Sequence, residues 1–129
     1  MAYMIDTSVA IPMRDGDASL IERIVALPAP PIMSVLTRVE LEGGVWRVPS
    51  DAAARRYALD TMLATIPVFP FDDDAAVVYG HIIGALGWSR AKIFDRMIAA
   101  HAIRLDVSLV TLNGADFRGI PGLKLQEWA

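Results

Sequence analysis

The stretch Tyr3-Met4-Ile5-Asp6-Thr7-Ser8-Val9 decides how the fold begins, because an apolar run ends in an acid that is followed at once by two hydroxyl residues. Residues 2–5 predict a short buried strand, since they are apolar and too few for a helix. Thr7 or Ser8 is suited to cap a following helix. Asp6 is thereby placed at the carboxyl end of a strand, where ligands bind in open α/β sheets. The alternative is that Asp6 serves only as the N-cap of the next helix.

Composition limits the classes of protein to which the chain can belong. Its 129 residues predict a single domain spanning 1–129. It is 54% hydrophobic, yet no apolar run reaches the about 18 residues that a membrane span needs. It has no cysteine and no cationic, apolar leader, so a cytoplasmic location is expected. The net charge of −3 counts against a DNA-coating protein, because nucleic acid would have to be held by local basic patches or by metal.

Helical and extended patterns alternate along the rest of the chain. The first helix is expected to end near Met13 and to be interrupted by Pro12, while Ser34 and Ser50 are predicted to cap later helices. Helices are predicted over about 7–13, 18–27, 34–46, 51–63, 72–86 and 92–105, and strands at 32–33, 108–111 and 123–126. Two prolines place the extended segment 66–71 at a sheet edge or in a loop. Strands separated by helices predict an α/β fold with a central, mostly parallel sheet flanked by α-helices.

Four acids, Asp6, Glu40, Asp95 and Asp116, each lie among apolar or small residues at or near the end of a predicted element. Half-buried carboxylates are costly unless something positive neutralises them. If the four converge, their repulsion favours a bound divalent cation or protonation. Oxygen donors, with no cysteine and only two histidines, favour Mg²⁺ or Mn²⁺ over zinc.

Helical spacing selects which acids face the packed side of their helices. Asp95 precedes Ile98 and Ala99 by one turn, so its side chain is expected beside the packing face. Glu40 is expected in a similar position. Glu42 lies about 200° further round the helix and is expected to be solvated.

Four segments, in order along the chain, are similar to the motifs of PIN-domain ribonucleases. They are residues 3–8, residues 34–41, residues 95–102, and residues 109–123 with Asp116-Phe117 and Ile120-Pro121-Gly122-Leu123. Within that superfamily the chain resembles VapC toxins of toxin–antitoxin pairs. The resemblance implies that Asp6, Glu40, Asp95 and Asp116 form the acidic, metal-binding and catalytic quartet. It places Thr111 or Asn113 close by, and the hydroxyls of Thr7 and Ser8 are further candidates to assist metal or phosphate binding.

The resemblance also implies a function. It indicates a PIN-like domain that acts as a Mg²⁺-dependent endoribonuclease, with Mn²⁺ as a substitute, and as the toxin of a VapBC-type pair. RNA is then the substrate and a VapB-type antitoxin the partner. Independently, a chain that is 54% hydrophobic holds more apolar surface than one core readily absorbs. We expect a second copy, in a homodimer, and a short amphipathic antitoxin segment to cover the excess, and no membrane contact.

Other functional readings of the sequence are weaker. His81 and His101 lie within apolar helices and are expected to be structural or to face a partner. Ser8 has no recognisable His–acid pair and is not expected to be a nucleophile. An aspartyl-nucleophile phosphohydrolase would carry a second acid at position 8, where this chain has serine. A catalytically inactive PIN-like binding module would be expected to have an incomplete quartet.

Overall fold

The structure is a computed structural model that describes residues 2–129. Within these residues the α-helices are α1 (Thr7–Arg14), α2 (Ala18–Val25), α3 (Val35–Trp46), α4 (Ala52–Leu63), α5 (Asp73–Leu86) and α6 (Ile93–Leu105). The strands are β1 (Tyr3–Ile5), β2 (Ile32–Ser34), β3 (Val68–Phe69), β4 (Ser108–Thr111) and β5 (Lys124–Glu127). There are also three short 3₁₀ turns. The turn η1 (Pro49–Asp51) precedes α4, η2 (Arg90–Lys92) precedes α6, and η3 (Gly114–Asp116) follows β4.

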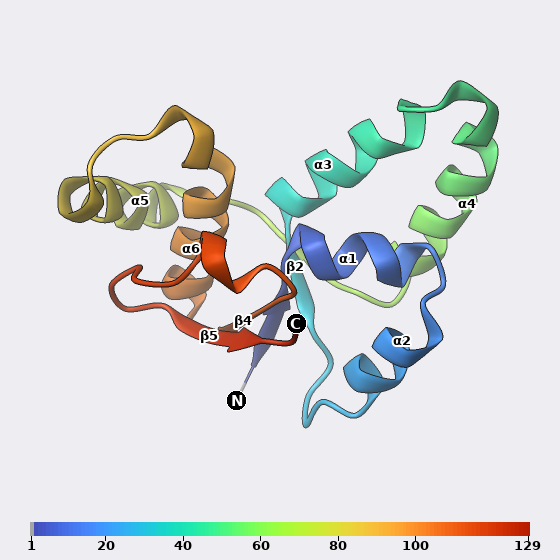
Figure 1. The fold of residues 1–129 in the computed structure, drawn as a ribbon, viewed down its shortest axis with the longest axis horizontal. Helices are drawn as coiled ribbons and strands as arrows, with labels where there is room; N and C mark the ends of the chain where they lie inside the picture. Colours follow the sequence, from blue (N-terminus) through green and yellow to red (C-terminus); the bar gives the residue numbers. More distant parts are fainter. Residues whose placement is uncertain (1) are drawn as a thin grey trace.

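The five strands form one sheet in the order β3-β2-β1-β4-β5 (Figure 1). Every pairing is parallel, and β1 lies at the centre, with Met4 opposite Ile32 on one side and Leu109 on the other. The predicted α/β fold with a mostly parallel central sheet is therefore confirmed. The two prolines in 66–71 flank a two-residue strand at the sheet edge, as expected of residues that cannot donate to a ladder.

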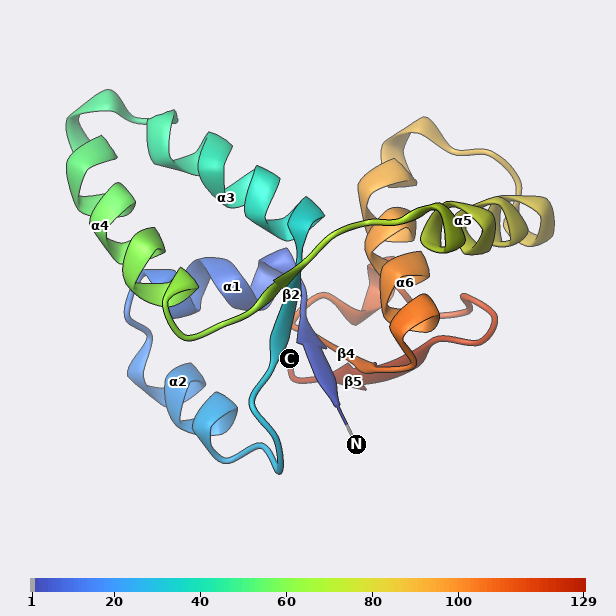
Figure 2. The ribbon, with the colours of Figure 1, turned by 180° about the vertical axis from the view of Figure 1, so that it is seen from behind.

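Helices cover both faces of the sheet. Figures 1 and 2 show α1 to α4 on one side of the strands and α5 with α6 on the other. Alternation along β1 explains the two cores, because successive strand residues point to opposite faces. Tyr3 and Ile5 belong to the core under α1 to α4, whereas Met4 packs with α5 and α6. No helix in residues 2–129 combines the length and the apolar character needed to cross a membrane.

Three predictions about helix ends were tested by the structure. Ser34 caps α3 as predicted, accepting the N–H of Leu36 at 3.1 Å. Ser50 does not cap α4, because it lies inside η1 and Asp51 directly precedes the helix without a side-chain cap. Pro12 does not interrupt α1, which continues to Arg14. Proline lacks the N–H that would donate to the carbonyl four residues earlier, so α1 loses the one hydrogen bond from position 12 to Ser8.

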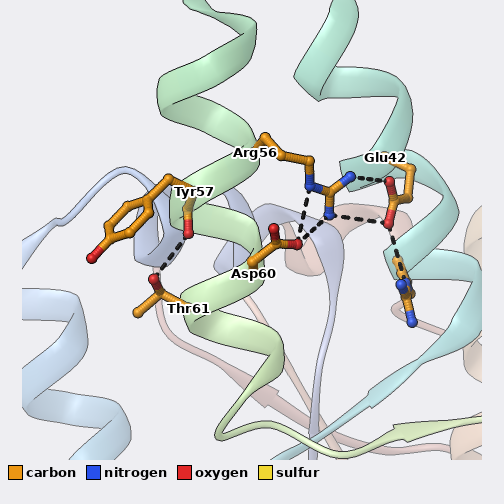
Figure 3. A network of polar contacts seen from close by, with 6 residues as sticks. Glu42, Arg56, Tyr57, Asp60 and Thr61 are labelled. Atoms are coloured by element: carbon orange, nitrogen blue, oxygen red, sulfur yellow. Dashed lines mark hydrogen bonds and ion pairs between the residues drawn. The ribbon is translucent and has the colours of Figure 1, made fainter.

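Helices α3 and α4 form an arm that turns at η1 (Figure 2). An ion-pair network joins them: Arg56 of α4 binds Glu42 of α3 at 2.5 Å and Asp60 at 2.7 Å (Figure 3). Arg38 also reaches Glu42, at 3.3 Å. The expectation that Glu42 is simply solvated was wrong, because α4 packs on that face of α3. These contacts hold the arm's two helices together on the side of α3 that carries Glu42.

Candidate active site

Asp6 is the first residue after the central strand and is almost fully buried, with 3% of its surface exposed. It caps α1, since its Oδ1 accepts the N–H of Val9 at 3.1 Å. The sequence prediction that Thr7 or Ser8 would cap this helix was wrong. Both hydroxyl residues lie in the first turn of α1 instead. The capping role does not exclude a role at a ligand site, because a carboxylate has about four lone-pair directions.

Hydroxyl groups fix both oxygens of Asp6. Ser8 donates to Oδ1 and Thr111, at the end of β4, donates to Oδ2, each at 2.6 Å. Ser8 Oγ in turn accepts the N–H of Leu112 at 3.0 Å, and Thr111 Oγ1 accepts that of Asn113 at 2.9 Å. Burial raises the pKa of the Asp6 carboxyl, and these hydrogen bonds oppose the rise. Ser8 and Thr111 thus hold the buried carboxylate in one orientation.

Glu40 approaches this region from α3. Its Oε1 accepts a hydrogen bond from Thr7 Oγ1 at 2.6 Å, and Thr37, one turn earlier on α3, lies 3.2 Å from the same hydroxyl. Glu40 is exposed, so the expectation of a half-buried carboxylate was wrong. Its side chain nevertheless lies beside the face of α3 that contacts α1. The separation of Glu40 from Glu42 is as predicted, since Glu40 contacts α1 and Glu42 contacts α4.

Asp95 lies in the first turn of α6, where the helix dipole favours an anion. Nevertheless its pKa is raised to about 6. Burial is the largest cause, and the negative charges of Asp116, Glu40 and Asp6 follow. Lys92 acts in the opposite direction. The structure therefore brings the charges of the three other sequence-predicted acids to bear on the Asp95 carboxyl group.

Asp116 reaches the site from η3, after β4. Asn113 Nδ2 donates a short hydrogen bond to its Oδ2. Asn113, predicted as an assisting residue, contacts Asp116 and not Asp6. Gly114 lets the side chain of Glu127, on β5, lie against this turn, because an added Cβ would overlap with Glu127 Oε1. A tight turn therefore supports the Asp116 side of the site.

Comparisons with known proteins agree with this geometry. A sequence profile of the PIN domain matches residues 3–123. The chain belongs to the PIN domain family.

Individual relatives narrow the family further. "tRNA(fMet)-specific endonuclease VapC" of Shigella flexneri is 29% identical to this PIN domain over 133 residues, covering 100% of this chain and 99% of the relative. "Ribonuclease VapC1" of Rickettsia felis is 31% identical over 129 residues, covering 97% and 95%. The predicted resemblance to VapC proteins is thereby confirmed.

Solved structures show the same fold. The crystal structure of VapBC2 from Rickettsia felis, bound to a DNA fragment from its promoter, contains a chain that matches with a TM-score of 0.90 at 25% identity, covering 100% of both chains. The structure of VapBC-1 from nontypeable Haemophilus influenzae matches with a TM-score of 0.83 at 26% identity, covering 99% of this chain and 98% of that one.

The donor chemistry of the PIN-domain site fits a divalent cation. Its acids offer only oxygen, which suits Mg²⁺ or Mn²⁺. Burial first, and then the charges of the three other acids, raise the pKa of Asp95, and a cation would offset both effects. Within residues 2–129, however, no three acidic, histidine or cysteine side chains are gathered closely enough to form a ready-made metal site. Asp6, Glu40 and Asp116 each turn at least one oxygen toward a hydroxyl or amide donor of the chain.

The histidines lie outside this arrangement. His101 is buried on α6, with Nδ1 2.7 Å from Ser34 Oγ and its ring edge-on to Phe71. His81 is exposed on α5. Sequence reasoning missed Thr37 and Lys92. Thr37 had a detectable signal, because it precedes Glu40 by three residues and so shares its helix face.

Proposed function

We propose that this PIN domain is a metal-dependent endoribonuclease and the toxin of a VapBC-type toxin–antitoxin pair. The observation that carries the proposal is the convergence of negative charge on Asp95, whose pKa is raised by burial and by Asp116, Glu40 and Asp6. A perturbed carboxyl group that faces Asp6, at the carboxyl end of the central strand, is typical of functional sites. The names of the VapC relatives, an endonuclease and ribonucleases, support the same reaction class.

We assign Asp6, Glu40, Asp95 and Asp116 as the residues that would hold the cation, with Mg²⁺ the expected ion and Mn²⁺ a substitute. When bound, the ion supplies a more acidic water and neutralises charge on the leaving oxygen of a phosphodiester. Ser8 and Thr111 hold the Asp6 carboxylate, and Asn113 holds that of Asp116. Thr7 orients Glu40 across the gap between α1 and α3. Without the ion, burial and the charges of Asp116, Glu40 and Asp6 raise the pKa of Asp95, and a bound cation would lower it and favour the ionised carboxylate that serves as a ligand.

The competing functions fit less well. An aspartyl-nucleophile enzyme carries a second acid two residues after the first, and in this chain Ser8 occupies that position and donates to Asp6. An inactive binding module has no need of four acids whose repulsion costs stability. The complete quartet therefore favours the nuclease.

The partner is proposed to be a VapB-type antitoxin, because similar chains are present in VapBC structures. Two grooves of about 340 and 320 Å³ are present, the first between α1, α2 and α4, and the second between α1, α2 and the segments 27–31 and 65–66. Their walls are mostly apolar and include Met13, Ile21, Ile24 and Met62. An amphipathic antitoxin segment is a fitting occupant. We further propose a single domain over 1–129, a homodimer, and a cytoplasmic location where RNA is available.

The test is cleavage of an end-labelled RNA by the purified protein with Mg²⁺, with Mn²⁺ or with EDTA. We expect cleavage only with the cations, and its loss in Asp6→Asn and Asp95→Asn variants whose circular dichroism is unchanged. Undiminished cleavage by either folded variant, or by wild type in EDTA, would contradict the mechanism. The toxin assignment is tested by growth arrest on expression of the chain alone and relief by co-expression of the neighbouring reading frame. Harmless expression of an active ribonuclease would remove the toxin role.

A further inference from the structure

A polar groove of about 580 Å³ adjoins the acidic site, between α1, α3 and the start of α4. We name it the arginine groove, and its wall includes Thr7, Arg14, Glu40, Trp46, Arg47 and Arg55. Two of these residues, Thr7 and Glu40, are hydrogen-bonded to each other at the acidic site. The arginine groove therefore continues directly from the place where the reaction is proposed to occur.

Arg14 is the unusual feature of this groove. It is a charged residue with only 9% of its surface exposed, and it lines the groove from the last turn of α1. A buried cation is costly unless it is paired. Across residues 2–129 its one ion-pair partner is Asp15, whose carboxylate meets Nε at 3.0 Å. The two terminal nitrogens of the guanidinium therefore have donors left for a ligand.

The groove is built to hold this side chain. Gly44 of α3 lies so close that an added Cβ would stand 3.2 Å from Arg14 Nη1. Arg55 of α4 is fixed against the same turn, because its Nη1 donates to the carbonyl oxygen of Gly44 at 2.8 Å. Arg47 adds a third, exposed cation. The guanidinium groups of Arg14, from α1, and Arg55, from α4, thus meet at Gly44 of α3.

The chemistry of the groove suits single-stranded nucleic acid. Three arginines and the acids Asp15 and Glu40 line it. A long contact of 4.0 Å between Arg55 Nη2 and Asp51 leaves Arg55 with donors for a ligand. Guanidinium groups bind phosphate in a bidentate manner. Trp46 is 68% exposed at its edge, and exposed aromatic rings are the surfaces on which unpaired bases stack. A protein carboxylate would also fit Arg14, but it would leave the exposed indole and the continuity with Glu40 without a role.

We propose that the arginine groove binds the substrate strand beside the scissile bond, with Arg14 and Arg55 on a backbone phosphate and Trp46 stacked on a base. This inference rests on the proposed ribonuclease function. It assigns binding of the strand to residues outside the acidic quartet, and it explains how a chain with a net charge of −3 attracts RNA. The quartet then repels the strand's phosphates unless a cation is present, while the groove attracts them in its absence.

The experiment measures binding of a fluorescent, single-stranded RNA hexamer to the full chain in EDTA, by anisotropy over a series of salt concentrations. We expect Arg14→Gln and Arg55→Gln to weaken binding by about tenfold and to reduce the salt slope by about 0.7 for each lost phosphate contact. Trp46→Ala is expected to weaken binding about tenfold, and Trp46→Phe to retain it within about twofold. Arg47→Gln, at an exposed position, is expected to reduce the salt slope without risk to folding.

Arg104→Gln is the matched control, since it removes an exposed arginine that pairs with Asp72 and Asp74 far from the groove. If wild type binds and cleaves RNA but the groove variants bind like the control, the groove proposal is wrong and the nuclease stands. If wild type neither binds nor cleaves RNA, both are wrong. If folded Arg14→Gln binds RNA normally and loses only its complex with the antitoxin, the groove belongs to the protein partner and the RNA assignment is overturned.

Discussion

Replacing Asp95 by asparagine is expected to stabilise the metal-free protein while removing its activity. Folding raises the pKa of this carboxyl from 3.8 to about 6, a change of about two units at about 1.4 kcal/mol each. Asp95 is partly exposed, so solvent screening reduces the resulting 3 kcal/mol to about 1–2 kcal/mol. For a chain of this size that corresponds to an increase in Tm of about 3–6 °C.

The sign of the pH dependence follows from the direction of the shift. The native state binds the Asp95 proton more tightly than the unfolded state, so the ionised carboxylate destabilises the fold above pH 6, and the penalty disappears as the pH falls from 6 towards 3.8. The advantage of Asp95→Asn is therefore full at pH 8 and mostly lost at pH 4.

Urea unfolding followed by circular dichroism, in EDTA at pH 8, 6 and 4, measures this difference. Glu22→Gln is the control, because Glu22 is exposed on α2 and its replacement is expected to change stability by no more than about 0.5 kcal/mol. Millimolar Mg²⁺ should stabilise wild type more than Asp95→Asn. The variant lacks one of the carboxylates proposed to bind the ion, so it binds Mg²⁺ less tightly in the native state. The reasoning is refuted if Asp95→Asn is less stable than wild type at pH 8, or if its advantage is the same at all three pH values.

Three other changes separate the parts of the site. Glu40→Gln is expected to lower RNA cleavage at least about tenfold. Glu42→Gln should leave cleavage intact but weaken the packing of α4 on α3, which would be measured as faster amide exchange in α4. The reverse result would show that the wrong face of α3 was assigned to the site. Ser8→Ala should lower cleavage about 10- to 100-fold, because Asp6 loses a donor that orients it, and a change of less than twofold would contradict this. Burial lowers the pKa of His101, so acid should destabilise wild type relative to His101→Gln as the pH falls below 6.5; parallel pH profiles in urea unfolding would exclude this.

Local signals in the sequence were sufficient to place Asp6. An apolar run that ends in an acid, followed by a helix, specifies a strand end and a cap within a few residues, and neither depends on distant parts of the chain. Ser34 was predictable as a cap for the same reason. The parallel sheet followed from the alternation of strands and helices, and the order of its strands was found only in the structure.

Contacts between distant segments explain what the sequence left open. The cap of α1 was misassigned because Asp6 and both following hydroxyls are good cap residues, and only the link of Ser8 and Thr111 to Asp6 decides among them. Glu42 was expected in solvent because nothing in its own helix predicts Arg56 on the next one. Arg14 gave no sequence signal either, since its burial depends on the close approach of Gly44.

Helix α3 contributes to the acidic site, to the arginine groove and to the contact with α4, because the helical period directs its side chains to different faces. Thr37, Glu40 and Gly44 follow one another by three and four residues and so lie along one stripe. That stripe runs from the contact with Thr7 to the position where Arg14 and Arg55 meet. Glu42, about 200° from Glu40, faces α4 and its arginine instead (Figure 3). One face of α3 thus fixes the arm, and the other lines a continuous path from the acids to the arginines, which is the route we assign to the RNA strand.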